Sequence, residues 1–223
     1  MAIELRREGE VFVLALDDGE NRFNDDSMKA WRTALDEVEG TDGPKALVTT
    51  GSGKFYSNGL DLDWAMANKK DDFGSYLRDV LGIYERVLTF PCITVAAMNG
   101  HAFGAGGQVA LAHDFRVMRE DRGYFCMPEI DMRMPLHPGM TAILQARLSA
   151  QTAHEVIATG RRFGGADALA AGIVEHVAPE ADVLPRAIEI AAGLSGKAHP
   201  VMSRLKADLY PETLAAFRAP MTP

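Results

Sequence analysis

The chain has 223 residues, a formal net charge of −8 and only two cysteines, Cys92 and Cys126. This length allows one domain with an appendage or two small domains, and an acidic chain without a Lys/Arg cluster argues against a nucleic-acid partner. Two isolated cysteines give neither a disulfide framework nor a zinc site, so we predict a protein without a metal site in a reducing compartment. No apolar run approaches the roughly 20 residues that span a bilayer. We therefore predict a cytoplasmic protein.

The first half of the chain alternates strand and helix patterns. The charged, alternating residues at the N-terminus indicate a strand rather than a signal peptide. Asp25 or Asp26 is suited to cap the helix that follows the first polar loop. In chain order we predict strands over 3–7 and 11–16 that form a hairpin, a helix over 27–39, a buried strand over 45–50 and a helix over 73–89.

The second half contains more helix. A β-branched apolar run from Ile93 ends at Asn99, glycines crowd 104–107, and an alanine-rich helical pattern follows. Pro128 should make the strand predicted over 124–130 an edge or irregular strand. We also predict strands over 115–118 and 173–177, helices over 138–149, 150–158, 164–172 and 183–194, and an amphipathic tail over 200–217. Strands that alternate with helices predict an α/β fold with largely parallel pairing.

Three segments carry the residues best suited to chemistry. Gly104-Ala105-Gly106 has almost no side chains, so a ligand could lie against its backbone and face the N–H groups of the following helix start. The loop 58–61 can offer another backbone N–H, and Glu129 is a carboxylate in an apolar setting. Taken singly, these segments fit a turn, a packing glycine and a surface acid equally well. We find no dinucleotide fingerprint, P-loop, nucleophile elbow or metal-ligand spacing of histidines.

Together and in this order, the motifs resemble those of the crotonase (enoyl-CoA hydratase/isomerase) superfamily over nearly the whole chain. The markers are Phe-Tyr-Ser-Asn-Gly-Leu-Asp-Leu over 55–62, the stretch 96–107, His113-Asp114 and Pro128-Glu129. More specifically, the short monofunctional Δ3,Δ2-enoyl-CoA isomerases are similar at 22–23, 53–59, 121–123 and 209–212. The resemblance implies a crotonase-like spiral of repeated ββα units over 1–190, a helical C-terminal region over 191–223 and a homotrimer or hexamer.

The resemblance also implies the substrate and the site. The backbone N–H groups of Leu60 and Ala105 would hold the carbonyl oxygen of an acyl-CoA thioester and stabilise an enolate. Hydratases of this family use two glutamates, and these positions here hold Gln108 and Glu129. An amide can hold a water but cannot take its proton. One carboxylate suffices to move a double bond, so we expect a Δ3,Δ2-enoyl-CoA isomerase of fatty-acid beta-oxidation that needs no cofactor beyond the CoA of its substrate.

Further substrate contacts are carried over from the family. Arg22, Phe23 and Asn24 are candidate contacts to CoA. Trp64 and Met66 are candidates for the acyl pocket because they lie just past the loop 58–61, and core packing explains them equally well. The remaining candidate contacts are Asn58, Gly59, Asp61, Leu62, Gly104, Gly106, Gln108 and Pro128.

Arg133 departs from the family pattern, which usually has glycine four residues after this glutamate. The loop that shapes the acyl pocket could therefore differ, and Asp131 or His137 could reach the site.

Two alternatives stay open: an enoyl-CoA hydratase in which Gln108 positions water, and a non-catalytic acyl-CoA-binding homologue. The C-terminal Pro-Met-Thr-Pro is not a peroxisomal address of the Ser-Lys-Leu kind, which favours the cytoplasm.

Overall fold

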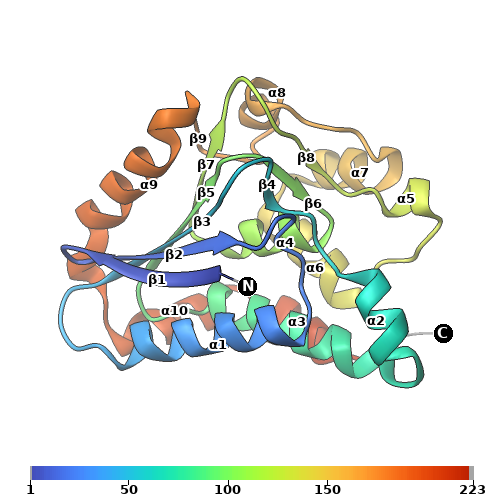
Figure 1. Ribbon diagram of the computed structural model, residues 1–223, viewed down its shortest axis with the longest axis horizontal. Helices are drawn as coiled ribbons and strands as arrows, with labels where there is room; N and C mark the ends of the chain where they lie inside the picture. Colours follow the sequence, from blue (N-terminus) through green and yellow to red (C-terminus); the bar gives the residue numbers. More distant parts are fainter. Residues whose placement is uncertain (1, 221–223) are drawn as a thin grey trace.

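A six-stranded sheet forms the centre of the computed structural model, which describes residues 2–220 (Figure 1). Its strand order is β1-β2-β3-β5-β7-β9. The first pair is an antiparallel hairpin and every other pair is parallel, which confirms the predicted α/β class with largely parallel pairing. The strands are β1 Ala2–Glu8, β2 Val11–Asp17, β3 Ala46–Gly51, β5 Ile93–Met98, β7 Phe115–Arg119 and β9 His176–Ala178.

A second, three-stranded parallel sheet has the order β4-β6-β8. Its strands are β4 Phe55–Ser57, β6 His101–Phe103 and β8 Phe125–Cys126. Each follows a strand of the large sheet along the chain, namely β3, β5 and β7, and each precedes a helix. The fold therefore contains the repeated ββα unit that the resemblance implied, and the turn after each short strand opens at the same edge of the small sheet.

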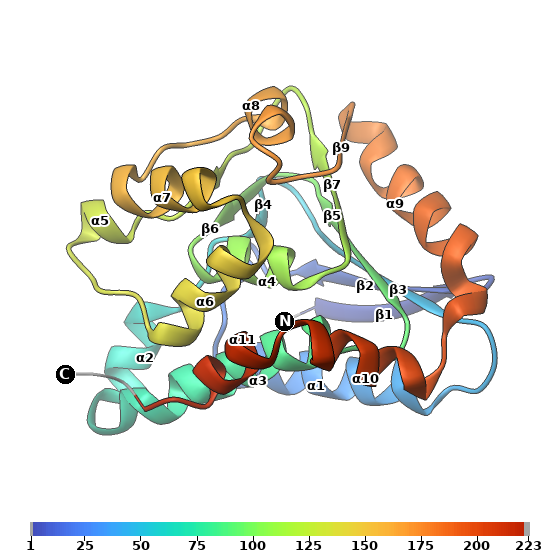
Figure 2. The same cartoon turned by 180° about the vertical axis from the view of Figure 1, so that it is seen from behind.

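Strands β2, β3, β5 and β7 of the large sheet are mostly buried on both faces, while the edge strand β1 is partly exposed. The helices divide between the two faces (Figures 1 and 2). Helix α9 packs Val183, Ala187 and Ala191 against the valines and alanines of one face. The opposite face packs on the larger core, which includes α1, α3, α4 and α6. The helices are α1 Asp25–Gly40, α2 Leu62–Asn68, α3 Phe73–Leu88, α4 Ala105–Ala112, α5 Glu129–Met132, α6 Pro138–Arg147, α7 Ala150–Thr159, α8 Gly165–Ala170, α9 Glu180–Leu194, α10 Pro200–Leu209 and α11 Pro211–Phe217.

Several predicted boundaries were wrong. Asn24, not Asp25 or Asp26, caps α1, because its side chain accepts the N–H of Ser27 in a capping box. The strand predicted over 124–130 is only β8, since Pro128 cannot donate to a ladder and instead starts α5. The strand predicted over 173–177 is shifted to β9. Helix α2, which Asp61 caps, and the short strand β4 were not predicted.

The C-terminal region forms two consecutive helices rather than one amphipathic segment. Pro211 opens α11, whose Phe217 is buried, while α10 exposes Val201, Leu205 and Leu209. Residue 190, the predicted end of the core, lies inside α9 and not in a linker. The division into a core over 1–190 and a C-terminal region over 191–223 stays a prediction. Within residues 2–220, no helix is long and apolar enough to cross a membrane.

Candidate active site

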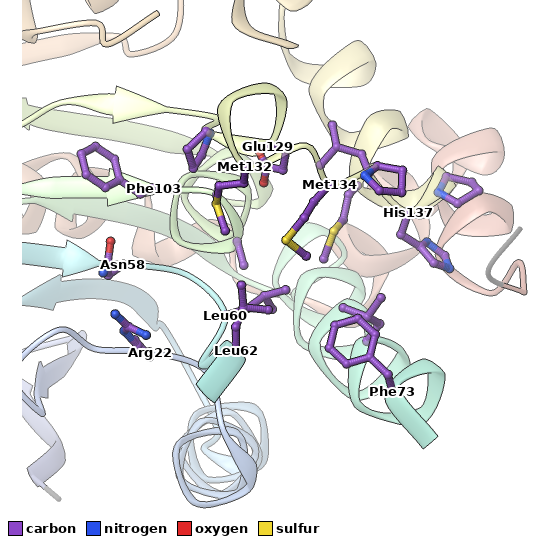
Figure 3. A pocket seen from close by; sticks show the side chains of 18 residues that line it. Arg22, Asn58, Leu60, Leu62, Phe73, Phe103, Glu129, Met132, Met134 and His137 are labelled. Carbon is purple, nitrogen blue, oxygen red and sulfur yellow. The ribbon is translucent and has the colours of Figure 1, made fainter. Parts of the chain in front are cut away.

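A cavity of about 290 Å³ opens where the turns after β4, β6 and β8 meet. Its wall combines these three turns with α3 and with the loop that leads into α6 (Figure 3). The lining residues are Arg22, Asn58, Leu60, Leu62, Phe73, Leu77, Phe103, Gly104, Ala105, Pro128, Glu129, Met132, Met134, Pro135, Leu136, His137, Pro138 and Met140. A concave, mainly apolar pocket with a few polar groups is the usual form of a small-molecule site.

The backbone amides of two neighbouring turns belong to residues that line this cavity, Leu60 and Ala105. Gly59 has φ +85°, and a Cβ placed on it would lie 2.7 Å from Phe103 O and 3.1 Å from Ala105 N, so the two turns touch. Within the described chain, neither the N–H of Leu60 nor that of Ala105 donates a hydrogen bond. The buried Tyr84 hydroxyl donates to Ala105 O at 3.0 Å and fixes this turn from below. The site thus presents two adjacent free donors, one of them at the positive end of α4.

The predicted reason for the glycines is partly wrong. Gly104 has φ +49°, which favours glycine, and a Cβ there would lie 3.2 Å from Glu129 Oε1. A Cβ on Gly106, however, would meet Ser57 O at 2.3 Å, because the first turn of α4 packs on β4. Gly106 is therefore needed for the close approach of these elements and does not line the cavity.

Glu129 is the one carboxylate among the lining residues. It is the first residue of α5, and its Oε2 is buried without a hydrogen-bond partner in the described residues. This burial raises the pKa of the carboxyl above its ordinary value. A raised pKa suits a carboxyl that first takes up a proton and then returns it, and its Oε1 lies beside the turn that carries the Ala105 amide.

The two ends of the cavity differ in character (Figure 3). Arg22, Asn58 and Phe103 lie at one end, while Phe73 and His137 lie at the other. At the polar end, Arg22 donates to Glu20 at 2.6 Å and Asn58 donates to the same carboxylate at 2.8 Å. These hydrogen bonds, first that of Asn58 and then that of Arg22, lower the pKa of Glu20. The other end is apolar and suited to a hydrocarbon chain.

His137 was correctly considered as a residue that could reach the site, but its ring is already engaged. Its Nδ1 accepts the N–H of Gly139 at 3.0 Å, and its Nε2 donates to Ala219 O at 3.1 Å. Burial lowers the pKa of this histidine, so the ring is a neutral helix cap at the cavity wall. Asp131 is exposed and does not line the cavity.

The structure brings together eight of the predicted site residues and excludes others. Arg22, Asn58, Leu60, Leu62, Gly104, Ala105, Pro128 and Glu129 line the cavity. The residues that do not are Phe23, which is buried against Trp31 and Tyr84, Asn24 and Asp61, which cap helices, and Gly59 and Gly106, which pack the turns. Trp64 packs on Tyr76 and Met66 is exposed, so neither lines the acyl end.

Gln108 does not reach the cavity either. It is fully buried three residues into α4, and its Nε2 lies 3.5 Å from Met127 Sδ. Its Oε1 has no hydrogen-bond partner in the part of the chain described here. The side chain points to the β8 side of the helix, so the geometry gives no support to a water held by Gln108 over a substrate.

Sequence reasoning missed most of the apolar wall. Phe73 and Leu77 were predicted only as parts of the helix over 73–89, and Met132, Met134 and Met140 were assigned no role. The available signal was the group of methionines at the end of α5, in the loop after it and in α6, since unbranched side chains suit a wall that must adapt its shape.

Arg133, the departure from the family pattern, has a left-handed backbone (φ +56°, ψ +38°) where it ends α5. Only glycine takes this conformation without steric cost. We therefore expect Arg133→Gly to raise the free energy of unfolding by up to about 1 kcal/mol, measured by urea denaturation. Arg78→Gly, inside α3, should instead lose about 1 kcal/mol. A loss at both positions would contradict this account of Arg133.

Residues 6–216 match the model of the enoyl-CoA hydratase/isomerase family, and the chain belongs to this family. The predicted superfamily is thereby confirmed. A relative, the protein named enoyl-CoA delta isomerase 2, peroxisomal, of Arabidopsis thaliana, is 33% identical and the match covers 93% of this chain and 92% of that protein.

Solved structures share the fold closely. A probable enoyl-CoA hydratase of Mycobacterium tuberculosis has a TM-score of 0.89 at 26% identity, over 97% of this chain and 91% of that chain. A structure named as the Mtb enoyl-CoA isomerase has a TM-score of 0.88 at 27% identity, over 97% and 94% of the two chains. These two structures are of the same mycobacterial protein, named by different reactions, so likeness to its fold does not choose between hydration and isomerisation.

Proposed function

We propose that this chain is a Δ3,Δ2-enoyl-CoA isomerase that acts in fatty-acid beta-oxidation. The observation that carries the proposal is a single buried carboxyl, Glu129, that lines the same apolar cavity as Leu60 and Ala105, whose backbone N–H groups donate no hydrogen bond in the described chain. The isomerase names among the relatives agree with it. Hydration needs a second group that takes a proton from water, and Gln108 is an amide turned away from the cavity.

In the proposed mechanism, the thioester oxygen accepts hydrogen bonds from the Leu60 and Ala105 amides. Glu129 removes a proton from C2 of the 3-enoyl thioester, and the electron pair spreads over a dienolate whose negative charge rests on that oxygen. The amides stabilise this charge where it develops. Glu129 then returns the proton to C4, which leaves the double bond between C2 and C3. Its raised pKa suits a group that is first base and then acid.

The test uses two substrates in separate reactions. With a 3-enoyl-CoA, we expect absorbance of the conjugated 2-enoyl thioester to appear, and with a 2-enoyl-CoA in water we expect no loss of it. Loss of absorbance on the second substrate would indicate a hydratase. Deuterium exchange at C2 separates an enzyme from a non-catalytic acyl-CoA binder, because a binder exchanges nothing.

We also propose that the protein assembles as a homotrimer or hexamer. Val201, Leu205 and Leu209 lie on one face of α10 and are 53%, 60% and 70% exposed, which is unusual for large apolar residues arranged as a stripe. Sedimentation equilibrium should give three or six times the chain mass of 24.2 kDa.

The cytoplasmic location stays a prediction, to which the peroxisomal names of two relatives lend no support.

A further inference from the structure

We propose that two buried tyrosines of α3, Tyr76 and Tyr84, are positioning residues for the isomerisation, because their hydroxyls hold the turns after β4 and β6. The inference rests on the proposed function, in which the Leu60 and Ala105 amides of these turns bind the thioester oxygen. It adds two side chains that do not themselves line the cavity.

Tyr84 holds the turn after β6. Its side chain is fully buried, and its hydroxyl donates to Ala105 O at 3.0 Å. This carbonyl belongs to the residue whose N–H is one of the two free donors. Burial first, and then the neighbouring Glu129 and Tyr76, raise the pKa of Tyr84 well above its ordinary value. The hydroxyl therefore stays protonated and remains a donor to the first residue of α4.

Tyr76 holds the turn after β4. It is fully buried as well, and its hydroxyl accepts the N–H of Asp61 at 3.1 Å and donates to Phe23 O at 2.7 Å. The same N–H of Asp61 also donates to Phe23 O at 3.0 Å, and Phe23 pairs with Leu60 in a parallel bridge. The hydroxyl thus fixes the backbone directly after Leu60, the residue that carries the other free amide. Burial raises the pKa of Tyr76 too.

One helix therefore supports both turns. Tyr76 and Tyr84 are eight residues apart in α3, which corresponds to about 12 Å along the helix axis. Phe23 links them, since its carbonyl accepts from Tyr76 and its ring lies edge-on to Tyr84 at 6.4 Å between centroids. Further rings restrict the two phenols: Phe73 lies 5.6 Å from Tyr76, and Phe217 lies 6.2 Å from Tyr84.

This support suits the proposed chemistry. Two donors stabilise a negative charge best when they already stand where the charge develops and do not move as it forms. Because a helix is a stiff element, turns that are hydrogen-bonded to one helix keep their separation when a thioester enters. The net contribution of one such hydrogen bond corresponds to a factor of about three to ten in rate.

A third fully buried tyrosine, Tyr56, offers a matched control. Its hydroxyl lies 2.8 Å from Thr49 Oγ1 on β3, and this oxygen lies 2.9 Å from His113 Nε2. The Tyr56 hydroxyl is therefore bonded into the large sheet, and within residues 2–220 it forms no hydrogen bond with either turn. Its removal costs the same kind of buried hydrogen bond without loosening the two donors.

The kinetic test compares Tyr76→Phe and Tyr84→Phe with Tyr56→Phe. Each variant keeps the ring and removes one buried hydroxyl. We expect both α3 variants to lower kcat for a 3-enoyl-CoA about three- to tenfold. The Kd for a saturated acyl-CoA, measured by calorimetry, should change by less than about twofold, because the cavity wall is unchanged. Tyr56→Phe should keep the wild-type kcat, although its stability falls like that of the other two.

A spectroscopic measurement separates positioning from a general weakening of the fold. Hydrogen bonds from two amides polarise a thioester carbonyl and lower its stretching frequency. Infrared difference spectra of a bound saturated acyl-CoA, isotope-labelled at this carbonyl, report the effect without any turnover. We expect wild type and Tyr56→Phe to lower the frequency equally, and Tyr76→Phe and Tyr84→Phe to lower it less.

The possible outcomes are distinct. A tyrosine of α3 whose variant keeps both the wild-type kcat and the wild-type carbonyl frequency has no positioning role. Equal losses in Tyr56→Phe would overturn the inference for both residues. Wild-type protein that polarises the bound carbonyl but isomerises no enoyl-CoA would overturn the proposed function and leave this inference standing.

Discussion

Glu129→Gln should lower kcat for isomerisation of a 3-enoyl-CoA by about three orders of magnitude or more, because the amide can neither remove nor return a proton. The variant should still bind acyl-CoA, since the Leu60 and Ala105 amides and the apolar wall are unchanged. Steady-state kinetics and calorimetry on the same preparation check the two halves of this result. Asp131→Asn, an exposed carboxylate two residues along α5, is the matched control and should keep wild-type activity.

The stability of the Glu129→Gln variant gives an independent check. Burial raises the folded-state pKa of Glu129 above its ordinary 4.5. The stability contributed by the neutral acid is complete below about pH 4.5 and is lost as the pH rises through the folded-state pKa. Glutamine does not ionise, so at pH 8 the variant should unfold at a temperature no lower than wild type. An active variant would contradict the catalytic assignment of Glu129, and a variant that unfolds at a lower temperature than wild type at pH 8 would contradict this account of its burial.

Gly59→Ala should lower kcat/KM about 100-fold or more by separating the two amide donors. The residue has φ +85°, and its new Cβ would lie 2.7 Å from Phe103 O and 3.1 Å from Ala105 N. The turns after β4 and β6 would have to move apart, and the distance between the Leu60 and Ala105 amides would change with them. We also expect a loss of about 1–3 kcal/mol in the free energy of unfolding, measured by urea denaturation.

Gly82→Ala provides the control for this substitution. Gly82 lies on the exposed side of α3, where a Cβ meets no atom within 4 Å. The change should raise stability by about 0.5–1 kcal/mol and leave activity unchanged, since alanine favours a helix interior. If Gly59→Ala retained wild-type kcat, the contact between the two turns would have no role in holding the thioester.

Local patterns in the sequence predicted the large sheet well, because its strands are long apolar runs and its hairpin alternates. They missed β4 because a strand of three residues is defined by its partners in space rather than by its own periodicity. Pro128 was recognised as a strand breaker, but not as the residue that starts α5 and so carries Glu129 into the cavity.

The residues of the candidate site were predicted best where they belong to a turn with a recognisable sequence motif. The turn residues Leu60 and Ala105 and the acid Glu129 meet in one cavity as expected. The direction of Gln108 could not be predicted, because it depends on how α4 sits between β4 and β8. The wall built by Phe73, Leu77 and the loop before α6 comes from segments whose contacts are long-range, so no local pattern marks it.

Three methionines of that wall, Met132, Met134 and Met140, line the cavity where, under the proposed function, the acyl chain would lie. Methionine side chains rotate about three bonds and change conformation at little energetic cost. The shape of this cavity wall can therefore adapt to a bound acyl chain. The same sulfur atoms make this wall sensitive to oxidants. Oxidation of the methionines to sulfoxides would make the apolar surface polar and so weaken its contact with a hydrocarbon chain.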